Sequence, residues 1–547
     1  MLTQFAQPKG STIGLLKDGR TVEEAILELT TLTTNGAQAV SPKGFGAVAG
    51  QDATLAINSA ATAAAAQGKA LDLRGGPWKV SGTLDFTNVR TVVSDASGTI
   101  IVDNDNFTSK FTNRYAITFG NPDVAWGSGR TAHTQVLGTL VVNSMTRTTP
   151  LHGIYFKGSW FGVGVVRANG FNGSAVTLEA VWDSIFGSMS GELSGNITDY
   201  QIDVRGGGDT SNCIFIGRIQ SERAYHKCLR LSAIRSVFNT IHAERTAVLT
   251  IDDGTTLADG VTKYTTFQLN LGNSVVNQLI HDAITGNAPD GQPTVGVASA
   301  RLDMDYSNLN AAALGSCIVN TNSGRNSQFT SVVAQKWTFS STATNNVISN
   351  VRIADNLAAA NMTTFVGGTI ETLTPRFNAS DLLFDNVAIK QLNFAADIKG
   401  NIRFRACRFP ETMTIGTTRA PEGYSATSTL GETNLPVTFE NCILLGTFVG
   451  AFQSRAVWEG GYIKAVNLVS RAAVEFYGTA MGSFDCTGDT AYVTRQCRAS
   501  TASNWARTTH VAYPIGTITE RLGVDSGAAG LAFRNTDGTA DGWTKIY

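Results

Sequence analysis

A short pattern of apolar and polar positions recurs six times in the C-terminal half of the chain. Each copy begins with an aromatic residue, continues through small or polar residues and ends with another apolar residue. The copies are Phe365–Ile370, Phe384–Ile389, Phe404–Phe409, Phe439–Leu444, Trp458–Ile463 and Phe476–Met481. They begin 19, 20, 35, 19 and 18 residues apart, so one interval contains an insertion. A strand, a bend and a second strand repeated about every 20 residues indicate a parallel β-solenoid.

The middle of the chain shows the same rhythm as pairs of apolar residues separated by one position. These pairs are Ile154/Phe156, Val176/Leu178, Ile202/Val204, Leu229/Leu231 and Leu249/Ile251. Because side chains alternate between the two faces of a strand, the residues between the pairs should form one exposed column. That column contains Tyr155, Thr177, Asp203, Arg230 and Thr250.

The remaining segments suggest four regions. Residues 1–40 form a leading adaptor segment with a short helix at Val22–Leu29. Residues 41–90 contain an Ala-rich helix at Leu55–Ala66 and then strands, which we expect to cap the open end of the first coil. The solenoid with its binding groove occupies residues 91–495, and residues 496–547 form a terminal β oligomerisation element.

Composition narrows the possible partners. The chain has 56 Gly, 16% charged residues and a formal net charge of -1, which favours an all-β fold and neither nucleic acid nor an anionic membrane as partner. No apolar run is long enough to span a membrane, and the N-terminus does not begin a secretory signal, so we expect synthesis in a host cytoplasm. The seven cysteines show no metal-like spacing, and Cys407 and Cys442 should lie inside the coil. We expect no metal and no cofactor.

Three coils share a second motif that ends in glutamate. The motif covers Met189–Glu192, Ile219–Glu222 and Ile241–Glu244. If its first residue points inward, alternation places the three carboxylates in one outward column. Neighbouring coils lie about 4.8 Å apart, so adjacent carboxylates would be roughly 5 Å apart, as in retaining glycosidases. Repulsion between like charges would raise one of the pKa values and create an acid.

Other side chains near this column are candidates for substrate binding. Arg223, Arg245 and His242 would bind or orient the substrate, while no cation is expected beside Glu192. Trp182 offers either an aromatic platform for a sugar ring or a filler between subunits. Insertions in the neighbouring coils favour this location. Alternatively, the Glu and Arg side chains form a surface ladder of neutralised charges.

A second pair of carboxylates lies further along the chain. Asp303 and Asp305 should share one face of a strand, with Leu302, Met304 and Tyr306 on the other face. The alternative is a solvated strand edge or a salt bridge between subunits.

The opening of the expected cap and the segment before it carry a family resemblance. Phe45-Gly46-Ala47 is followed by Asp52, Thr54, Ala56 and Ile57, and the segment PKGSTIGLLKDGRTV precedes them. With the solenoid, these features resemble bacteriophage tailspikes of the pectate-lyase-like β-helix class, in particular capsule depolymerases. The resemblance implies a right-handed, single-stranded parallel β-helix that forms a homotrimer. It also implies attachment through residues 1–40 to a virion tail or another tail fibre protein, and cleavage of a bacterial surface polysaccharide.

The resemblance supplies no transferable catalytic motif, so the reaction remains a hypothesis from the residues. We expect hydrolysis of a capsular or O-antigen polysaccharide, with Glu222 and Glu244 as the acid and the nucleophile or base, in an order that stays open. One alternative is a polysaccharide lyase that uses His242 with Arg245, or Tyr306. Another is a tail fibre that binds the glycan as an adhesin without cutting it.

Overall fold

The computed structural model describes residues 39–545, with internal gaps. The gaps are residues 125–127, 197, 206–210, 225–226, 245–266, 283–297, 360–361, 376–380, 394–400, 416–436, 451–454, 470–472, 488–490, 496, 504–517, 521–522, 525–531 and 536–542. The structure forms two compact units, one built mainly from residues up to Asn270 and the other mainly from Leu271 onward.

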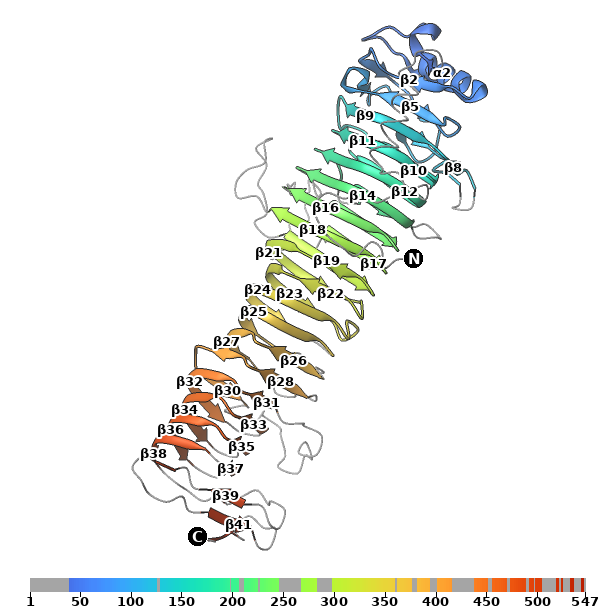
Figure 1. Cartoon of the computed structure of the whole chain (residues 1–547). Helices are drawn as coiled ribbons and strands as arrows, with labels where there is room; N and C mark the ends of the chain where they lie inside the picture. The colour runs from blue at the N-terminus through green and yellow to red at the C-terminus, as the bar shows by residue number, and fades with distance from the viewer. Residues whose placement is uncertain are drawn as a thin grey trace. The chain divides into compact units, whose positions relative to one another are not determined.

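The first unit begins with a small cap and continues as short parallel strands (Figure 1). Its elements are β1 (Ala39–Val40), η1 (Pro42–Phe45), α2 (Thr54–Gln67), β2 (Ala70–Asp72), β3 (Trp78–Val80), β4 (Leu84–Asp85), β5 (Thr91–Ser94), η2 (Ala96–Gly98), β6 (Ile100–Val102), β7 (Tyr115–Phe119), β8 (Thr131–Ala132), β9 (Gln135–Ser144), β10 (His152–Ser159), β11 (Gly162–Asn169), β12 (Val176–Glu192), β13 (Tyr200–Arg205), β14 (Ser211–Glu222), β15 (Lys227–Ile234), β16 (Val237–Glu244) and β17 (Phe267–Gly272).

The helix α2 occupies the position at which the sequence predicts one. Its apolar side is buried through Ile57, Ala60, Ala61 and Ala64, each no more than 2% exposed. The helix ends at Gly68, whose φ of 63° is the left-handed conformation that glycine adopts without steric cost. In Figure 1, α2 lies beside β2 and β5 at the start of the first unit.

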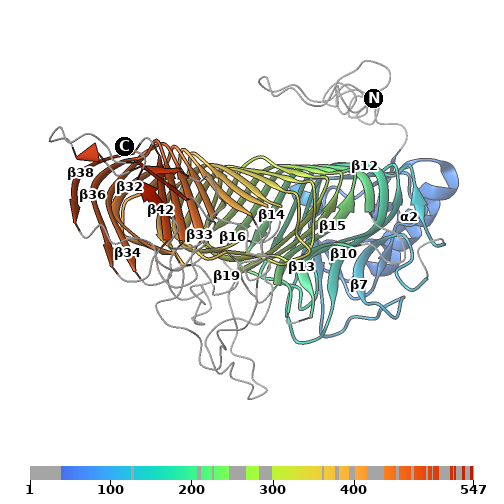
Figure 2. The same cartoon turned by 90° about the horizontal axis from the view of Figure 1, so that it is seen from below.

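The predicted strand pairing of the first unit is confirmed. Ile154 lies opposite Val176, Val176 opposite Ile202, and Ile202 opposite Leu229, so β10, β12, β13 and β15 stack in register (Figure 2). Tyr155, Thr177, Asp203 and Arg230 form the expected column between the apolar pairs. Thr250 lies outside the described residues.

The prediction that this column is exposed is wrong. Tyr155 and Thr177 have no exposed surface, and Asp203 is 3% exposed. The physical reason is that large neighbours pack on the same side. The ring of Tyr115 lies 4.8 Å from that of Tyr155, and its hydroxyl donates to Thr177, while Arg230 pairs with Asp203.

The second unit is also built from parallel strands, followed by a small antiparallel sheet near the C-terminus. Its strands are β18 (Val275–Asp282), β19 (Ala298–Asp305), β20 (Asn308–Leu309), β21 (Ala312–Thr321), β22 (Gln328–Thr330), β23 (Val332–Phe339), β24 (Val347–Ala358), β25 (Thr364–Leu373), β26 (Leu382–Asp385), β27 (Ala388–Leu392), β28 (Ile402–Arg405), β29 (Arg408–Phe409), β30 (Met413–Ile415), β31 (Val437–Glu440), β32 (Ile443–Gly450), β33 (Arg455–Glu459), β34 (Tyr462–Val469), β35 (Ala473–Tyr477), β36 (Ala480–Thr487), β37 (Ala491–Arg495), β38 (Arg498–Ser503), β39 (Ile518–Glu520), β40 (Gly523–Val524), β41 (Ala532–Asn535) and β42 (Trp543–Lys545).

Five of the six aromatic residues that begin the sequence repeats form a continuous stack inside the second unit. Their strands are in register, and the five rings, those of Phe365, Phe384, Phe404, Phe439 and Trp458, are stacked with centroid separations of 4.8, 5.1, 5.1 and 4.3 Å. The strand carrying Phe476 pairs next to that of Trp458. The aromatic residue that begins each sequence repeat is therefore the residue that aligns neighbouring coils.

The polar centre of each repeat forms a tight bend. Asn386, Ala406 and Asn441 have φ values of 55°, 51° and 52°, and Gly460 and Gly478 occupy the same place in the later repeats with φ of 69° and 61°. Asparagine and glycine tolerate this left-handed region best. The bend therefore explains why small and amide residues recur there.

Other features agree with the sequence in part. Cys407 and Cys442 are buried free thiols, as predicted, and contact the backbone carbonyls of Phe384 and Phe404 at 3.3 Å. The three antiparallel strands β39, β41 and β42 confirm β structure near the C-terminus, while their role in oligomerisation stays a prediction. Among the helices that the structure describes, none combines the length and the hydropathy needed to cross a bilayer.

We predict that Phe404→Ala lowers the free energy of unfolding of the second unit by about 3–5 kcal/mol, because it leaves a cavity between two stacked rings. Guanidinium denaturation monitored by far-UV circular dichroism measures the loss. Tyr462→Ala serves as control, since this aromatic side chain is 38% exposed and should change the same free energy by about 1 kcal/mol or less. Equal effects of the two substitutions would contradict the stacking argument.

Candidate functional site

One face of the first unit carries polar side chains on four neighbouring strand segments, and we call it the carboxylate face. The segments are residues 165–169 of β11, 188–192 of β12, 218–222 of β14 and 240–244 of β16. Glu192 lies opposite Glu222, and Glu222 opposite Glu244. Met189, Ile219 and Ile241 are fully buried, as the alternation requires. The predicted column of three glutamates is therefore confirmed in its backbone register.

The side chains of this column are partly paired. Arg223 contacts the Glu192 carboxylate at 3.1 Å, which contradicts the prediction that Glu192 has no cation beside it. The reason is the bend after β14, where Arg223 has a φ of 49°. Glu222 accepts a hydrogen bond from the side-chain amide of Gln220. The side chains of Glu244 and Arg245 lie outside the described residues.

A second outward column runs beside the glutamates on the carboxylate face. Arg167, Ser190, Gln220 and His242 are in register across the four strands. His242 is therefore a neighbour of the glutamate column, as predicted, and is half-buried. Successive coils of this face thus present hydrogen-bonding groups at a spacing of about 4.8 Å.

Trp182 lies away from the glutamate column. Its backbone is in register with Ser159 and Asn212, and the guanidinium of Arg130 lies 3.5 Å from the centre of its ring. One face of the indole is thus covered by a cation. Whether Trp182 is a platform for a sugar ring or a filler between subunits stays a prediction. Trp160, in the preceding coil, is 49% exposed and stacks on His133 with ring centroids 4.4 Å apart.

Asp303 and Asp305, in the second unit, do not form an exposed pair. Asp303 is 4% exposed and accepts hydrogen bonds from the backbone N–H groups of Asn322 and Ser323 at 2.8 and 2.9 Å. It also accepts one from Arg301. These contacts hold a turn of the next coil, which is why the carboxylate is buried.

Asp305 and Tyr306 stand at the surface next to this buried carboxylate. Asp305 pairs with Arg325 of the same chain at 3.3 Å, and Tyr306 is 56% exposed. Leu302 and Met304 are buried on the other face, as predicted. The observed ion pair joins two residues of one chain, and a salt bridge between subunits stays a prediction.

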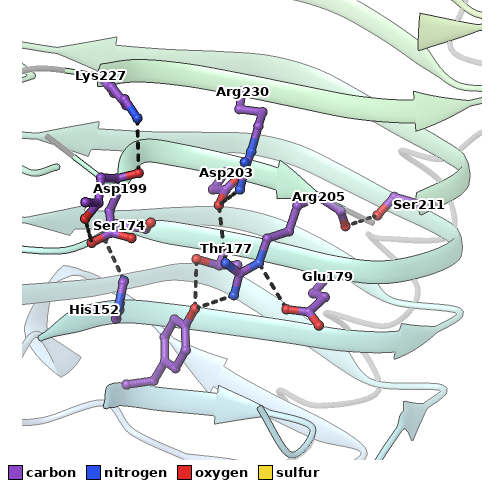
Figure 3. Close-up of polar contacts among 12 residues, drawn as sticks. His152, Ser174, Thr177, Glu179, Asp199, Asp203, Arg205, Ser211, Lys227 and Arg230 are labelled. Carbon is purple, nitrogen blue, oxygen red and sulfur yellow. Dashed lines mark hydrogen bonds and ion pairs between the residues drawn. The ribbon is translucent and has the colours of Figure 1, made fainter. Parts of the chain in front are cut away.

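The structure also shows a cluster that the sequence did not single out as a site, called here the Tyr155 cluster. Figure 3 shows its members Thr177, Glu179, Asp203, Arg205 and Arg230. The cluster contains Tyr115, Tyr155, Thr177, Glu179, Asp203, Arg205 and Arg230 from β7, β10, β12, β13 and β15. Arg230 binds both carboxylate oxygens of Asp203 at 2.7 Å. Arg205 donates to Glu179 at 3.0 Å and to the hydroxyl of Tyr115 at 3.3 Å.

Burial controls the protonation of the neutral groups in and beside this cluster. It raises the pKa of Tyr115 to about 12. Burial and then the negative charge of Glu179 raise the pKa of Tyr155 further above its ordinary value. Burial lowers the pKa of His152, which stacks on Tyr115 and accepts a hydrogen bond from the Ser174 backbone at 2.9 Å. The two tyrosines stay protonated, and the imidazole stays neutral, at ordinary pH.

The sequence contained a signal for part of this cluster. Tyr155, Thr177, Asp203 and Arg230 follow from the alternation, and Glu179 and Arg205 stand two positions later on their strands. Tyr115 could not be found in this way because it lies in a coil that the apolar pairs do not include. Among the described residues, no group of three His, Cys, Asp or Glu side chains has a geometry suited to a metal ion.

The comparisons with known proteins are distant. No family model matches the sequence. Over 230 residues the chain is 28% identical to a protein described as a depolymerase, capsule KN4-specific, from Klebsiella phage KN4-1. This match covers 38% of the chain and 26% of the relative, so the chain spans about a quarter of that protein's length.

Two solved structures overlap most of the chain with low similarity. ORF18 of Geobacillus virus E2 is 12% identical with a TM-score of 0.27, and covers 96% of this chain and 76% of its own. The surface adhesin PfbA of Streptococcus pneumoniae is 11% identical with a TM-score of 0.29, and covers 93% of this chain and 99% of its own. Similarity at this level supports no conclusion about function.

We predict that Asp203→Asn lowers the free energy of unfolding of the first unit by about 3 kcal/mol, because it leaves the guanidinium of Arg230 partly buried without its partner. Chemical denaturation measures the change. Asp305→Asn is the matched control, since this carboxylate is 45% exposed and its pair with Arg325 should contribute about 1 kcal/mol or less. Equal losses would show that the Asp203 pair is no stronger than a surface pair.

Proposed function

We propose that this protein binds a bacterial capsular or O-antigen polysaccharide and depolymerises it at the carboxylate face. The observation that carries the proposal is the register of Glu192, Glu222 and Glu244 on three neighbouring strands. The distant relative described as a capsule depolymerase supports the same substrate class. An extended polymer suits a face on which every coil offers a similar set of side chains.

The proposed reaction is hydrolysis of a glycosidic bond by two carboxyl groups. Neighbouring parallel strands lie about 4.8 Å apart, which is near the roughly 5 Å separation used by retaining glycosidases. Glu192 is paired with Arg223, so Glu222 and Glu244 are the proposed acid and nucleophile or base. The amide of Gln220 orients the Glu222 carboxylate. The order of the two roles remains open.

Substrate binding is assigned to the polar groups beside the glutamates. His242 lies in the adjacent outward column, and Arg223 and Arg245 follow the glutamate strands in sequence. The guanidinium groups of Arg223 and Arg245 would favour an acidic polysaccharide at this face. Asp303, Asp305 and Tyr306 lie in the second unit, and the proposal assigns them no role in this reaction.

The proposed assembly is a homotrimer on a virion tail, made in the host cytoplasm. Residues 1–40 would attach it to the tail or to another tail fibre protein, and the C-terminal β segment would join the subunits. We predict that light scattering of the purified chain at physiological salt gives three times the monomer mass of 57.9 kDa. A single-chain mass across the accessible concentration range would refute the trimer.

We predict that Glu222→Gln and Glu244→Gln each reduce depolymerisation by at least about a hundredfold, because general acid–base catalysis contributes about that much. Loss of polymer length, measured by size-exclusion chromatography with purified Klebsiella capsular polysaccharides, reports the activity. Glu371→Gln is the control, since this exposed glutamate pairs with Lys390 in the second unit. Full activity of both variants would remove the carboxylate face as the reaction centre.

The products separate the proposed reaction from its alternatives. Hydrolysis yields saturated ends, whereas a lyase using His242 yields an unsaturated uronate with ultraviolet absorbance. Binding of a capsule without any loss of polymer length identifies a glycan-binding adhesin and refutes the enzyme proposal.

A further inference from the structure

Two arginines on the carboxylate face have no carboxylate partner. Arg167 on β11 and Arg218 on β14 project outward from their strands and are exposed. Within the part of the chain that the structure describes, neither guanidinium makes a hydrogen bond or an ion pair. Arg223, in contrast, is already bound to Glu192. The positive charge that this face offers to a ligand therefore lies on Arg167 and Arg218.

The strand register explains why these two arginines stay unpaired. The residues opposite them in the neighbouring coils are all uncharged: Val141 and Ser190 for Arg167, and Ser188 and Thr240 for Arg218. Elsewhere in the first unit the same kind of position holds a partner, since Arg230 lies opposite Asp203 and binds it. The carboxylate face thus lacks the cross-strand partner that neutralises a buried arginine of the same unit.

Two serines lie between the arginines, on the intervening strand β12. Ser190 is the neighbour of Arg167, and Ser188 is the neighbour of Arg218. With coils about 4.8 Å apart and a rise of about 3.3 Å per residue, the Cα atoms of the two arginines are about 12 Å apart. An extended arginine side chain spans more than half of that distance, so the two guanidiniums can converge above the serines. The short serine side chains leave room for a ligand there, and their hydroxyls can donate to it.

The chemical group that suits this arrangement is the carboxylate of a sugar acid. A guanidinium presents parallel N–H groups that match the two oxygens of a carboxylate. Phe215, on the same strand as Arg218, is 42% exposed and adds an apolar surface beside the cations. A sugar acid combines a negative charge with an apolar ring face, whereas a free inorganic anion would use the cations alone.

We propose that the two arginines and the two serines form a binding site for the carboxylate of an acidic sugar. The members of this arginine–serine site are Arg167, Ser188, Ser190 and Arg218. The site rests on the proposed function, in that it binds a charged sugar of the polymer that the glutamates cut. Ser190 precedes Glu192 by two residues, or about 7 Å along the strand. The acidic sugar therefore lies next to the proposed point of cleavage and fixes the register of the polymer on the face.

Binding of an oligosaccharide tests the site without any need for depolymerisation. The probes are a fluorescently end-labelled oligogalacturonate and the same oligosaccharide after its carboxyl groups have been reduced to alcohols. Fluorescence anisotropy with the full chain at low salt gives both dissociation constants. We expect the acidic probe to bind at least about tenfold more tightly, because hydrogen bonds to a charged acceptor are stronger than those to a neutral one. No binding of the acidic probe, or equal binding of both probes, overturns the site.

Arg167→Gln and Arg218→Gln test the assigned residues. Each should weaken binding of the acidic probe about fivefold to tenfold, as expected for one lost charged partner, and leave binding of the reduced probe unchanged. The melting temperature should stay the same, because an exposed arginine without a partner adds little to stability. Unchanged binding of the acidic probe in both variants overturns the site.

Arg352→Gln is the matched control. Arg352 lies on β24 in the second unit, is exposed, and makes no ion pair with another described residue. Its replacement removes the same charge from a different surface, so it should leave binding of both probes unchanged. A loss equal to that in the variants of the arginine–serine site would show that the acidic probe is attracted non-specifically, and would overturn the site.

The two proposals fail separately. If the unaltered protein shortens none of the capsular polysaccharides, the proposed enzyme function fails, and the oligogalacturonate titration still decides whether the arginine–serine site exists. If a capsule is shortened, Arg167→Gln and Arg218→Gln should raise KM for it and leave kcat within about twofold, since they remove binding and not chemistry. An unchanged KM, or a loss confined to kcat, contradicts the proposed binding role.

Discussion

Parallel pairing of neighbouring coils in strict register is the constraint on which both units depend. Each strand must place its backbone groups opposite those of the next coil, about 4.8 Å away, so equivalent side chains lie above one another. Inside the second unit this condition brings Phe365, Phe384, Phe404, Phe439 and Trp458 into one stack. On the outer side of the first unit, the same condition aligns Glu192, Glu222 and Glu244. A single geometric rule thus creates both the core and the candidate site.

Alignment of equivalent side chains also brings charged groups close together on neighbouring coils. The partners that compensate these charges differ from place to place. On the carboxylate face, a neighbouring arginine at the end of β14 pairs with Glu192 in a partly exposed position. In the Tyr155 cluster, carboxylates and guanidiniums lie on adjacent strands, so the buried Asp203 is bound by Arg230 at two points. Asp303 is satisfied by two backbone N–H groups and one arginine. Burial of charge is tolerated where the partners come from the next coil.

The sequence predicts what depends on local alternation and on the repeat. The apolar pairs around Tyr155, the glutamate register and the cap helix all follow from spacing, and the structure contains them. It predicts less well what depends on side chains that reach between coils. Alternation predicts the side of the strand on which the Tyr155 side chain lies. It does not predict exposure, which depends on the neighbouring side chains, and here the ring of Tyr115 packs against Tyr155. In the same way, Arg223 turns back to Glu192 through a bend whose φ cannot be read from its residue type.

The buried thiols of the second unit bear on whether this part of the fold needs a disulfide bond. Cys407 and Cys442 stand one coil step apart in the repeat, and both are free thiols. The strands that lead to these two cysteines are held together by packing and backbone pairing, without a bond between the two sulfurs. This part of the fold can therefore form in a reducing compartment, where thiols are kept reduced.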